Sequence, residues 1–287
     1  MIDPGRLRTL VATEERQYTE ADSHLYALSV GFGADPMDLH ELPYVGGTPD
    51  SQVVPSMASI FAGVILQLTE GCQLRRPELA LHAEQRLEIF ATLRAADQLS
   101  IRGTVSELID RGEKGAQIAM SVDAFRKSDG VRVYRATYVT LARGDGGFTA
   151  EPAPSVVRRP ALERPTPDWS WSYTTRADQA LLYALNGDPN PIHVDPRAAQ
   201  GAGFARPILH GLCTYGIACR GVLRCVYGHD PRSLRSFNAR FSAPVIPGDT
   251  LLLDMWGNTT QLSFELKAVE RNVVVLRDGR CGSEVYS

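Results

Sequence analysis

The sequence lacks the features that mark membrane, secreted and nucleic-acid-binding proteins. No apolar run approaches the roughly 18 residues needed to cross a bilayer. The N-terminus has no basic start followed by an apolar stretch, and the last three residues are not a peroxisomal address. Lys and Arg total 30 against 33 acidic residues, a formal net charge of −3, so no basic footprint for nucleic acid is present. We expect a soluble cytoplasmic protein that binds neither nucleic acid nor membrane.

Paired cysteines are also missing. The five cysteines are an odd number and form no C-x-x-C pair, which favours free thiols in a reducing compartment. Three of them, Cys213, Cys219 and Cys225, fall at helical intervals in one apolar segment. We expect these to be buried as small hydrophobic residues.

One segment rich in Gly and Pro divides the chain. Residues 144–167 have no apolar periodicity and read as a linker. We therefore predict an N-terminal domain over residues 1–148, a linker over 149–167 and a C-terminal domain over 168–287, each domain of ordinary size.

The two halves repeat each other weakly, with an offset of roughly 150 residues between features that occur in the same order. The matched features are Tyr26-Ala-Leu with Tyr183-Ala-Leu, the apolar helical segments after Pro55 and Pro207, and Asp97-x-Leu with Asp249-x-Leu. This pattern indicates a duplicated domain.

Each half contains one apolar helix followed by segments that alternate apolar and polar residues, as antiparallel strands do. The predicted strand segments are 99–112, 116–130 and 131–144 in the first half, and 234–245, 249–259, 261–272 and 273–286 in the second. A sheet of this kind buries its apolar face on the helix, so the fold class is α+β. It resembles the hotdog fold, in which a curved antiparallel sheet wraps around a central helix, and two such units make a double hotdog.

Residues 183–193, Tyr-Ala-Leu-Asn-Gly-Asp-Pro-Asn-Pro-Ile-His, place an acid and an imidazole five positions apart in a segment too rich in Pro, Gly and Asn for a helix. Taken singly, Asp188 reads as a turn former and His193 as a capping residue. Together, in a loop of fixed shape just before a helix start, they can present two proton-handling groups to one substrate.

The helix start is Phe204-Ala-Arg-Pro-Ile-Leu-His-Gly211. The first amides of a helix have no intrahelical acceptor and can bind an oxyanion. Gly211 lets a ligand oxygen approach its amide closely. The alternative is that Gly211 only allows close packing of the helix on the sheet.

These motifs resemble the MaoC-like, hydratase 2 family of (R)-specific enoyl-CoA hydratases. The resemblance is carried by Tyr183-x-x-x-Gly-Asp188-x-Asn190-Pro-x-His193, Pro207-Ile-Leu-His210-Gly211 and Phe241-x-x-Pro-Val-x-Pro-Gly-Asp249-Thr-Leu. The first half resembles the non-catalytic first domain of two-domain members more loosely, at His82-x-Glu-Gln85 and from Lys114-Gly115 to Gly146-Gly147-Phe148.

The resemblance implies a function and a set of roles. The chain would add water reversibly to a trans-2-enoyl-CoA, with Asp188 and His193 as the catalytic pair and the Gly211 amide as the oxyanion donor. Tyr183, Asn190 and His210 would contact substrate or support the loop. No metal and no redox cofactor would be needed. The substrate would be an acyl-CoA, either fatty acyl, branched, polyketide or steroid side chain, and two copies of the chain could form a homodimer.

Other side chains carry weaker hypotheses. Asp35-Pro-Met-Asp-Leu-His40 repeats the Asp-to-His spacing but lacks the Asn-Pro, and we interpret it as a relic or a coincidence. Asp188, His193, Asp195 and His210 match no common metal-ligand spacing. Arginines that could pair with the CoA phosphates are Arg197, Arg206, Arg220, Arg224 and Arg240.

Two alternative functions remain at this point. One is a hotdog acyl-CoA thioesterase, which would release free CoA. The other is a non-catalytic acyl-CoA-binding partner subunit, in which the loop with Asp188 and His193 would be a relic.

Overall fold

The computed structural model describes residues 2–46, 49–61, 63–150, 153, 165–188 and 190–285. The chain forms two compact units, and each draws on separate stretches of sequence. The first contains Met1–Arg16, Phe61–Arg86 and Gln98–Thr166, and the second contains Gln17–Ile60, Leu87–Asp97 and Pro167–Ser287.

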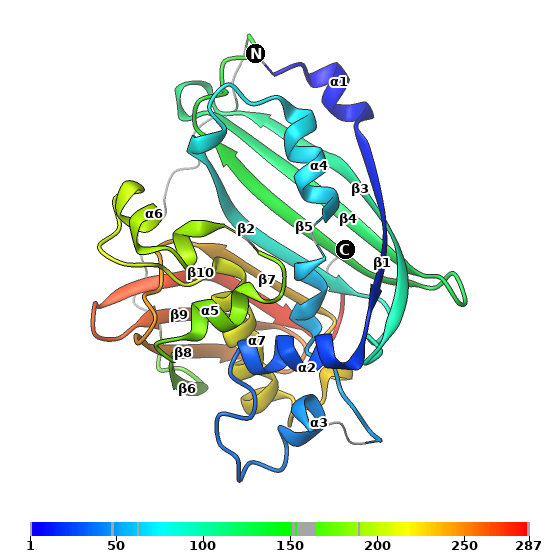
Figure 1. The fold of residues 1–287 in the computed structure, drawn as a ribbon, viewed down its shortest axis with the longest axis vertical. Helices are drawn as coiled ribbons and strands as arrows, with labels where there is room; N and C mark the ends of the chain where they lie inside the picture. Colours follow the sequence, from blue (N-terminus) through cyan, green and yellow to red (C-terminus); the bar gives the residue numbers. More distant parts are fainter. Residues whose placement is uncertain are drawn as a thin grey trace. The chain divides into compact units, whose positions relative to one another are not determined.

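The first unit is an antiparallel sheet with one main helix (Figure 1). Its strand order is β1-β3-β4-β5-β2. Helix α4 contacts strand β4, and the apolar face of β4, which includes Ile118, Met120 and Val122, is buried. The bounds of its elements are α1 Pro4–Thr9, β1 Val11–Tyr18, α4 Gly63–Cys72, η2 Pro77–Leu79, β2 Ala80–Ile89, β3 Asp97–Asp110, η3 Gly112–Lys114, β4 Ala116–Arg126 and β5 Arg132–Ala142.

The second unit is built around helix α7, Gly211–Val226, which is buried along most of its length. The helix packs on a sheet of order β7-β10-β9-β8-β6. The packing is close, because a Cβ atom on Gly221 would lie 2.5 Å from the Trp171 ring and 2.6 Å from Leu253. The Tyr215 hydroxyl also donates a 2.5 Å hydrogen bond to the Phe237 carbonyl of β7.

The remaining elements of the second unit are short helices and the strands of its sheet. Their bounds are α2 Glu20–Ser29, α3 Leu42–Val45, η1 Pro55–Ile60, β6 Trp169–Thr174, α5 Gln179–Ala184, η4 Pro191–His193, α6 Pro196–Gly201, η5 Pro231–Ser233, β7 Ser236–Phe241, β8 Thr250–Gly257, β9 Leu262–Ala268 and β10 Val273–Gly282.

The α+β class and the hotdog architecture are confirmed, and all seven predicted strand segments contain a strand. Strands β1, β2 and β6 had not been predicted. The predicted first-half helix is a 3₁₀ segment over Pro55–Ile60 and then α4. Most of the predicted linker over 149–167 lies outside the described residues.

The compact units differ from the two sequence halves. Residues 17–60 and 87–97 precede the predicted linker but cluster with the C-terminal residues. The physical reason is burial: helix α2 contacts α5, and the Glu41 carboxylate is fully buried in an ion pair with Arg220 of α7.

The cysteines are all free. Cys213 and Cys219 are fully buried, as expected, and Cys225 is half-buried. Among the described residues, no helix is both long enough and apolar enough to cross a membrane.

Candidate active site

Backbone hydrogen bonds bring together the three segments that the sequence singled out. The Ile208 amide, just before α7, donates to the Ile192 carbonyl of the loop over 183–193 at 3.3 Å. The Leu209 amide donates to the Val245 carbonyl at 2.8 Å. The segment before α7 is therefore held on one side by the loop and on the other by the stretch that follows β7.

Local hydrogen bonds shape the loop itself. The Asp188 Oδ1 atom accepts from the Asn190 amide at 3.1 Å, and the Asn190 Oδ1 atom accepts from the Ile192 amide at 3.3 Å. Pro191 then begins the 3₁₀ turn η4, which ends at His193. Asn190 thus caps the turn, and Asp and Asn make Asx turns of this kind.

His193 is buried, and only 8% of its surface is exposed. Its Nδ1 atom lies 2.8 Å from the Ile208 carbonyl oxygen. Because a carbonyl only accepts, Nδ1 must carry the proton, and in the neutral ring Nε2 then has a free lone pair. Burial lowers the pKa of His193 below its usual 6.5, while the bond to Ile208 and the charge of Asp188 oppose this shift. The ring is therefore neutral at pH 7, with Nε2 as a proton acceptor.

His210 is the residue before the first turn of α7 and is 1% exposed. Its ring stacks on His193 with 3.8 Å between centroids and lies 4.9 Å from the ring of Tyr183. Burial lowers the pKa of His210, and the neighbouring His193 adds to this shift. Two neutral imidazoles therefore lie face to face beside Asp188.

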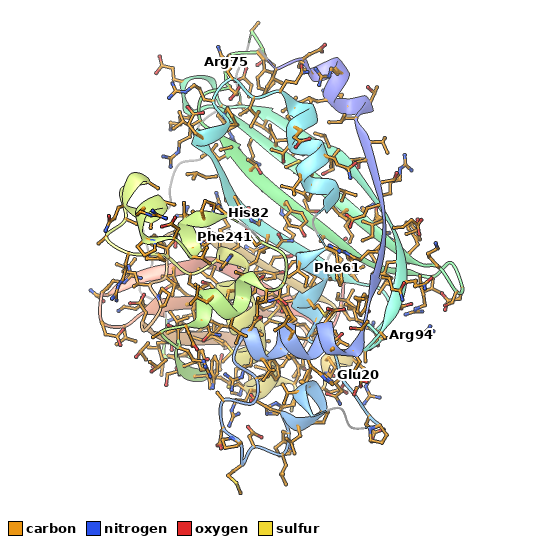
Figure 2. All side chains as sticks on the ribbon, viewed as in Figure 1. Glu20, Phe61, Arg75, His82, Arg94 and Phe241 are labelled. Atoms are coloured by element: carbon orange, nitrogen blue, oxygen red, sulfur yellow. The ribbon has the colours of Figure 1, made fainter. Side chains whose placement is uncertain are left out.

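Gly211 is the first residue of α7. Among the described residues no backbone acceptor faces its amide, as expected for the first position of a helix. A Cβ atom at this position would meet the Phe241 ring at 3.2 Å; Phe241 is labelled in Figure 2. A larger residue would thus require the Phe241 ring to shift by a few tenths of an ångström, in keeping with the packing interpretation, while the amide has no backbone acceptor among the described residues.

Asp188, His193 and His210 form the group with metal-ligand chemistry in the described part of the chain. Their ligand atoms lie within 4.8 Å of one another, and Asp188 is more exposed than the two histidines. Because the His193 Nδ1 atom donates to the Ile208 carbonyl, Nε2 is the nitrogen that can accept a proton or bind a metal. Asp195, the fourth residue considered, instead caps α6 through the Arg197 amide at 2.8 Å.

The echo of the motif in the first half lies elsewhere. The Asp35 carboxylate accepts from the Met37 amide at 2.9 Å, and His40 stacks on His229 with 5.3 Å between centroids. Neither belongs to the group around His193.

Four of the five arginines considered for CoA binding have carboxylate partners among the described residues, and one of these pairs is Arg240 with Asp278. Arg220 pairs with Glu41, and Arg224 pairs with Asp38. Arg197 forms an exposed ion pair with Asp195.

Sequence reasoning missed the residues that hold the site together. Ile208 acts through its carbonyl, and no side-chain pattern marks that role. Ser29, at the end of α2, accepts a hydrogen bond from Asn186 in the loop. These two residues are 157 positions apart, and no local signal links them.

Comparison with family models gives two matches that together span most of the chain. A model described as a MaoC-like domain matches residues 161–278. A model described as the N-terminal domain of MFE-2 hydratase 2 matches residues 16–144.

Several named proteins are similar over nearly the full length. Peroxisomal enoyl-CoA hydratase 2 of Arabidopsis thaliana is 35% identical over 275 residues, which cover 90% of this chain and 88% of that protein. Enoyl-CoA hydratase ChsH3 of Mycobacterium tuberculosis is 34% identical over 270 residues, with 92% of each chain covered.

Solved structures agree on the fold. The MaoC-like dehydratase of Phytophthora capsici matches all of this chain and all of its own with a TM-score of 0.84 and 25% identity. The full-length peroxisomal multifunctional enzyme type 2 of Drosophila melanogaster matches with a TM-score of 0.77 and 31% identity, covering 95% of this chain and 48% of that one.

Proposed function

We propose that this chain, a member of the MaoC-like, hydratase 2 family of enoyl-CoA hydratases, is itself a hydratase. It adds water reversibly to a trans-2-enoyl-CoA and forms the (R)-3-hydroxyacyl-CoA. The observation that carries this proposal is the neutral, buried His193: its Nδ1 is held by the Ile208 carbonyl, and its ring has a nitrogen within 4.8 Å of an Asp188 carboxylate oxygen. Activation of water needs such an acceptor close to a second polar group.

In the proposed mechanism, Asp188 and His193 hold one water molecule between them. One O–H bond of the water breaks as its proton passes to the pair, and its oxygen bonds to Cβ of the enoyl group. The electron pair of the Cα–Cβ double bond moves towards the thioester carbonyl and gives an enolate-like state. The proton held by the pair then returns to Cα, so the enzyme is unchanged.

The Gly211 amide is the proposed donor to the thioester oxygen. Negative charge on that oxygen grows as water adds, and a preorganised amide at a helix N-terminus stabilises it. Removal of one such donor typically costs about 10²–10³ in kcat.

A direct assay follows the loss of enoyl absorbance with crotonyl-CoA and longer enoyl-CoAs, with chiral analysis of the product. Asp188→Asn and His193→Ala should each abolish hydration while the protein stays folded. The matched control is the double variant Asp35→Asn/His40→Ala, which changes the same residue types at the same spacing and should keep most of the activity. Wild-type turnover in both site variants, or release of free CoA in place of hydration, would contradict the proposal.

Three further expectations belong to this proposal. The reaction proceeds with no metal and no redox cofactor. Two copies of the chain associate as a homodimer, which sedimentation would test. The protein acts in the cytoplasm; since the Arabidopsis relative is named peroxisomal, cell fractionation is the decisive measurement.

The acyl group is a fatty acyl or steroid side chain in this proposal. A panel of enoyl-CoAs of increasing length, compared by kcat/KM, would rank these classes.

A further inference from the structure

Helix α2 ends at Ser29, whose side chain and backbone are fully buried in the second unit. The Ser29 carbonyl accepts from Gln179 Nε2 at 2.6 Å and from the Cys213 thiol at 3.4 Å. Its hydroxyl accepts from Asn186 Nδ2 at 2.9 Å and donates to the Tyr26 carbonyl at 2.7 Å. One residue therefore receives hydrogen bonds from three separate elements.

Each of the three donors lies next to a part of the candidate site. Asn186 is two residues before Asp188 in the loop. Cys213 is in the first turn of α7, two residues after Gly211. Gln179 begins α5, the helix that also carries Tyr183.

Asn186 is itself held from two directions. Its Nδ2 atom donates to Ser29 and also to the Tyr183 carbonyl, at 2.9 Å in each case. By contrast, the Asp188 side chain accepts a local hydrogen bond, from the amide of Asn190. The position of Asp188 relative to α7 therefore depends on the loop backbone and on what anchors Asn186.

We propose that Ser29 is a positioning residue for the hydration reaction: its hydroxyl, through Asn186, fixes the loop that carries Asp188 against the start of α7. This inference rests on the proposed function. Ser29 does not touch the reacting atoms, and its role is to keep Asp188 and His193 aligned with the Gly211 amide. Misplacement of a reacting group by about 1 Å can cost up to roughly 10²-fold in rate.

The test is Ser29→Ala, which removes the hydroxyl and leaves the backbone carbonyl in place. The change removes the hydrogen bond from Asn186 and the local one to the Tyr26 carbonyl. From the first loss we expect a fall of about tenfold in kcat, with KM changed less than about twofold. The matched control is Ser23→Ala in the same helix, because Ser23 is 2% exposed and donates to the Ala95 carbonyl at 2.7 Å. Ser23→Ala should lower thermal stability to a similar extent and leave kcat unchanged.

A second measurement does not depend on turnover. Hydrogen exchange of the peptide covering residues 183–194 should accelerate in Ser29→Ala and stay as in wild type in Ser23→Ala. Asn186→Ala removes the donor of the bond to the Ser29 hydroxyl, at a residue that is less buried than Ser29, and should also lower kcat. The double variant should be about as slow as Asn186→Ala alone, because the two changes share the Ser29–Asn186 bond and the other bonds that they remove, to the Tyr26 and Tyr183 carbonyls, are local.

The outcomes separate the two proposals. An unchanged kcat and unchanged exchange in Ser29→Ala would overturn the positioning role while leaving the hydratase intact. Wild-type protein that does not hydrate any enoyl-CoA would overturn the proposed function, and the exchange result would still report whether Ser29 holds the loop. If Ser29→Ala does not fold, wild-type kcat in Asn186→Ala overturns the inference.

Discussion

Glu41 and Arg220 form a buried ion pair whose disruption should have a large and measurable cost. The Glu41 Oε1 atom lies 2.7 Å from Arg220 Nε, and its Oε2 atom lies 3.0 Å from Nη2. Glu41 is 0% exposed and Arg220 4% exposed. The guanidinium also lies over the rings of Phe32, Trp171 and Tyr173, at 5.6, 5.3 and 5.0 Å from their centroids.

The perturbation is Glu41→Gln, which keeps the shape of the side chain and removes its charge. Arg220 would then remain buried without a full counter-charge. Arg224, which lies 3.6 Å from the Glu41 Oε1 atom, would also lose part of its attraction to Glu41. Breaking one partner of a buried pair typically costs about 3–5 kcal/mol. We expect the free energy of unfolding of the second unit to fall by that amount.

Urea unfolding followed by tryptophan fluorescence measures this effect in the right place. The three tryptophans, Trp169, Trp171 and Trp256, all belong to the second unit. The matched control is Asp178→Asn, which breaks an ion pair with Arg176 whose side chains are 57% and 59% exposed. An exposed pair contributes about 0–1 kcal/mol, so this control should barely shift the midpoint.

The double variant Glu41→Gln/Arg220→Met completes the experiment. It removes the stranded charge, and buried pairs replaced by apolar residues often lose little stability. We expect it to be more stable than Glu41→Gln alone. A loss below about 1 kcal/mol in Glu41→Gln, equal to that of the surface control, would refute the reasoning.

Four further measurements would test the roles of His193, Asp110 and Gly211 and the absence of a metal. First, burial lowers the pKa of His193 below 6.5, so the neutral base persists at pH 7; kcat/KM should be flat from about pH 7 to 8 and fall only as the pH drops below about 6.5, and a fall beginning above pH 7 would contradict a neutral His193. Second, burial raises the pKa of Asp110, but hydrogen bonds from Gly147, Gly112 and Thr149 together outweigh this effect and lower the pKa to about 2. Its stabilising effect should be complete above about pH 4 and be lost as the pH falls towards 2, and Asp110→Ala should cost about 2–4 kcal/mol at pH 7 by thermal unfolding. Third, Gly211→Ala keeps the backbone N–H but adds a methyl group 3.2 Å from the Phe241 ring. The crowding at the start of α7 should lower kcat by about tenfold or more, and an unchanged kcat would show that the site does not need glycine at this position. Fourth, prolonged dialysis against EDTA should leave the hydration rate unchanged. If activity is lost on dialysis and returns only when Zn²⁺ is added, the cluster around His193 is a metal site.

Several of the strands that the sequence predicted correctly show an alternation of apolar and polar residues, although β6, WSWSYT, also alternates and was missed. Strand β8, Thr250–Gly257, alternates in burial along its length. Strands β1 and β2 have charged sequences, VATEERQY and ALHAEQRLEI, and little apolar alternation. Their strand conformation comes from pairing with neighbours in the sheet, which is a non-local property.

The site was predictable as a set of residues but not as an assembly. Proline, glycine and asparagine spacing indicated a shaped loop at Asp188, and a helix does begin at Gly211. The tautomer of His193, by contrast, follows from the Ile208 carbonyl. A backbone atom 15 positions away leaves no trace in side-chain type.

The sequence repeat and the compact units divide the chain at different places. The repeat correctly identified two copies of a helix-and-strand pattern, since Tyr26 lies on α2 and Tyr183 on α5. Yet those two helices contact each other within the second unit, with the tyrosine rings at 6.2 Å. Both copies therefore keep a helix and a set of strands, but helix α2 of the first copy packs with the second. Ser29 ends that helix, and Glu41 lies in the loop after it. The C-terminal half by itself therefore lacks the buried carboxylate that pairs with Arg220 and the hydrogen-bond partner of Asn186, although its own core requires both.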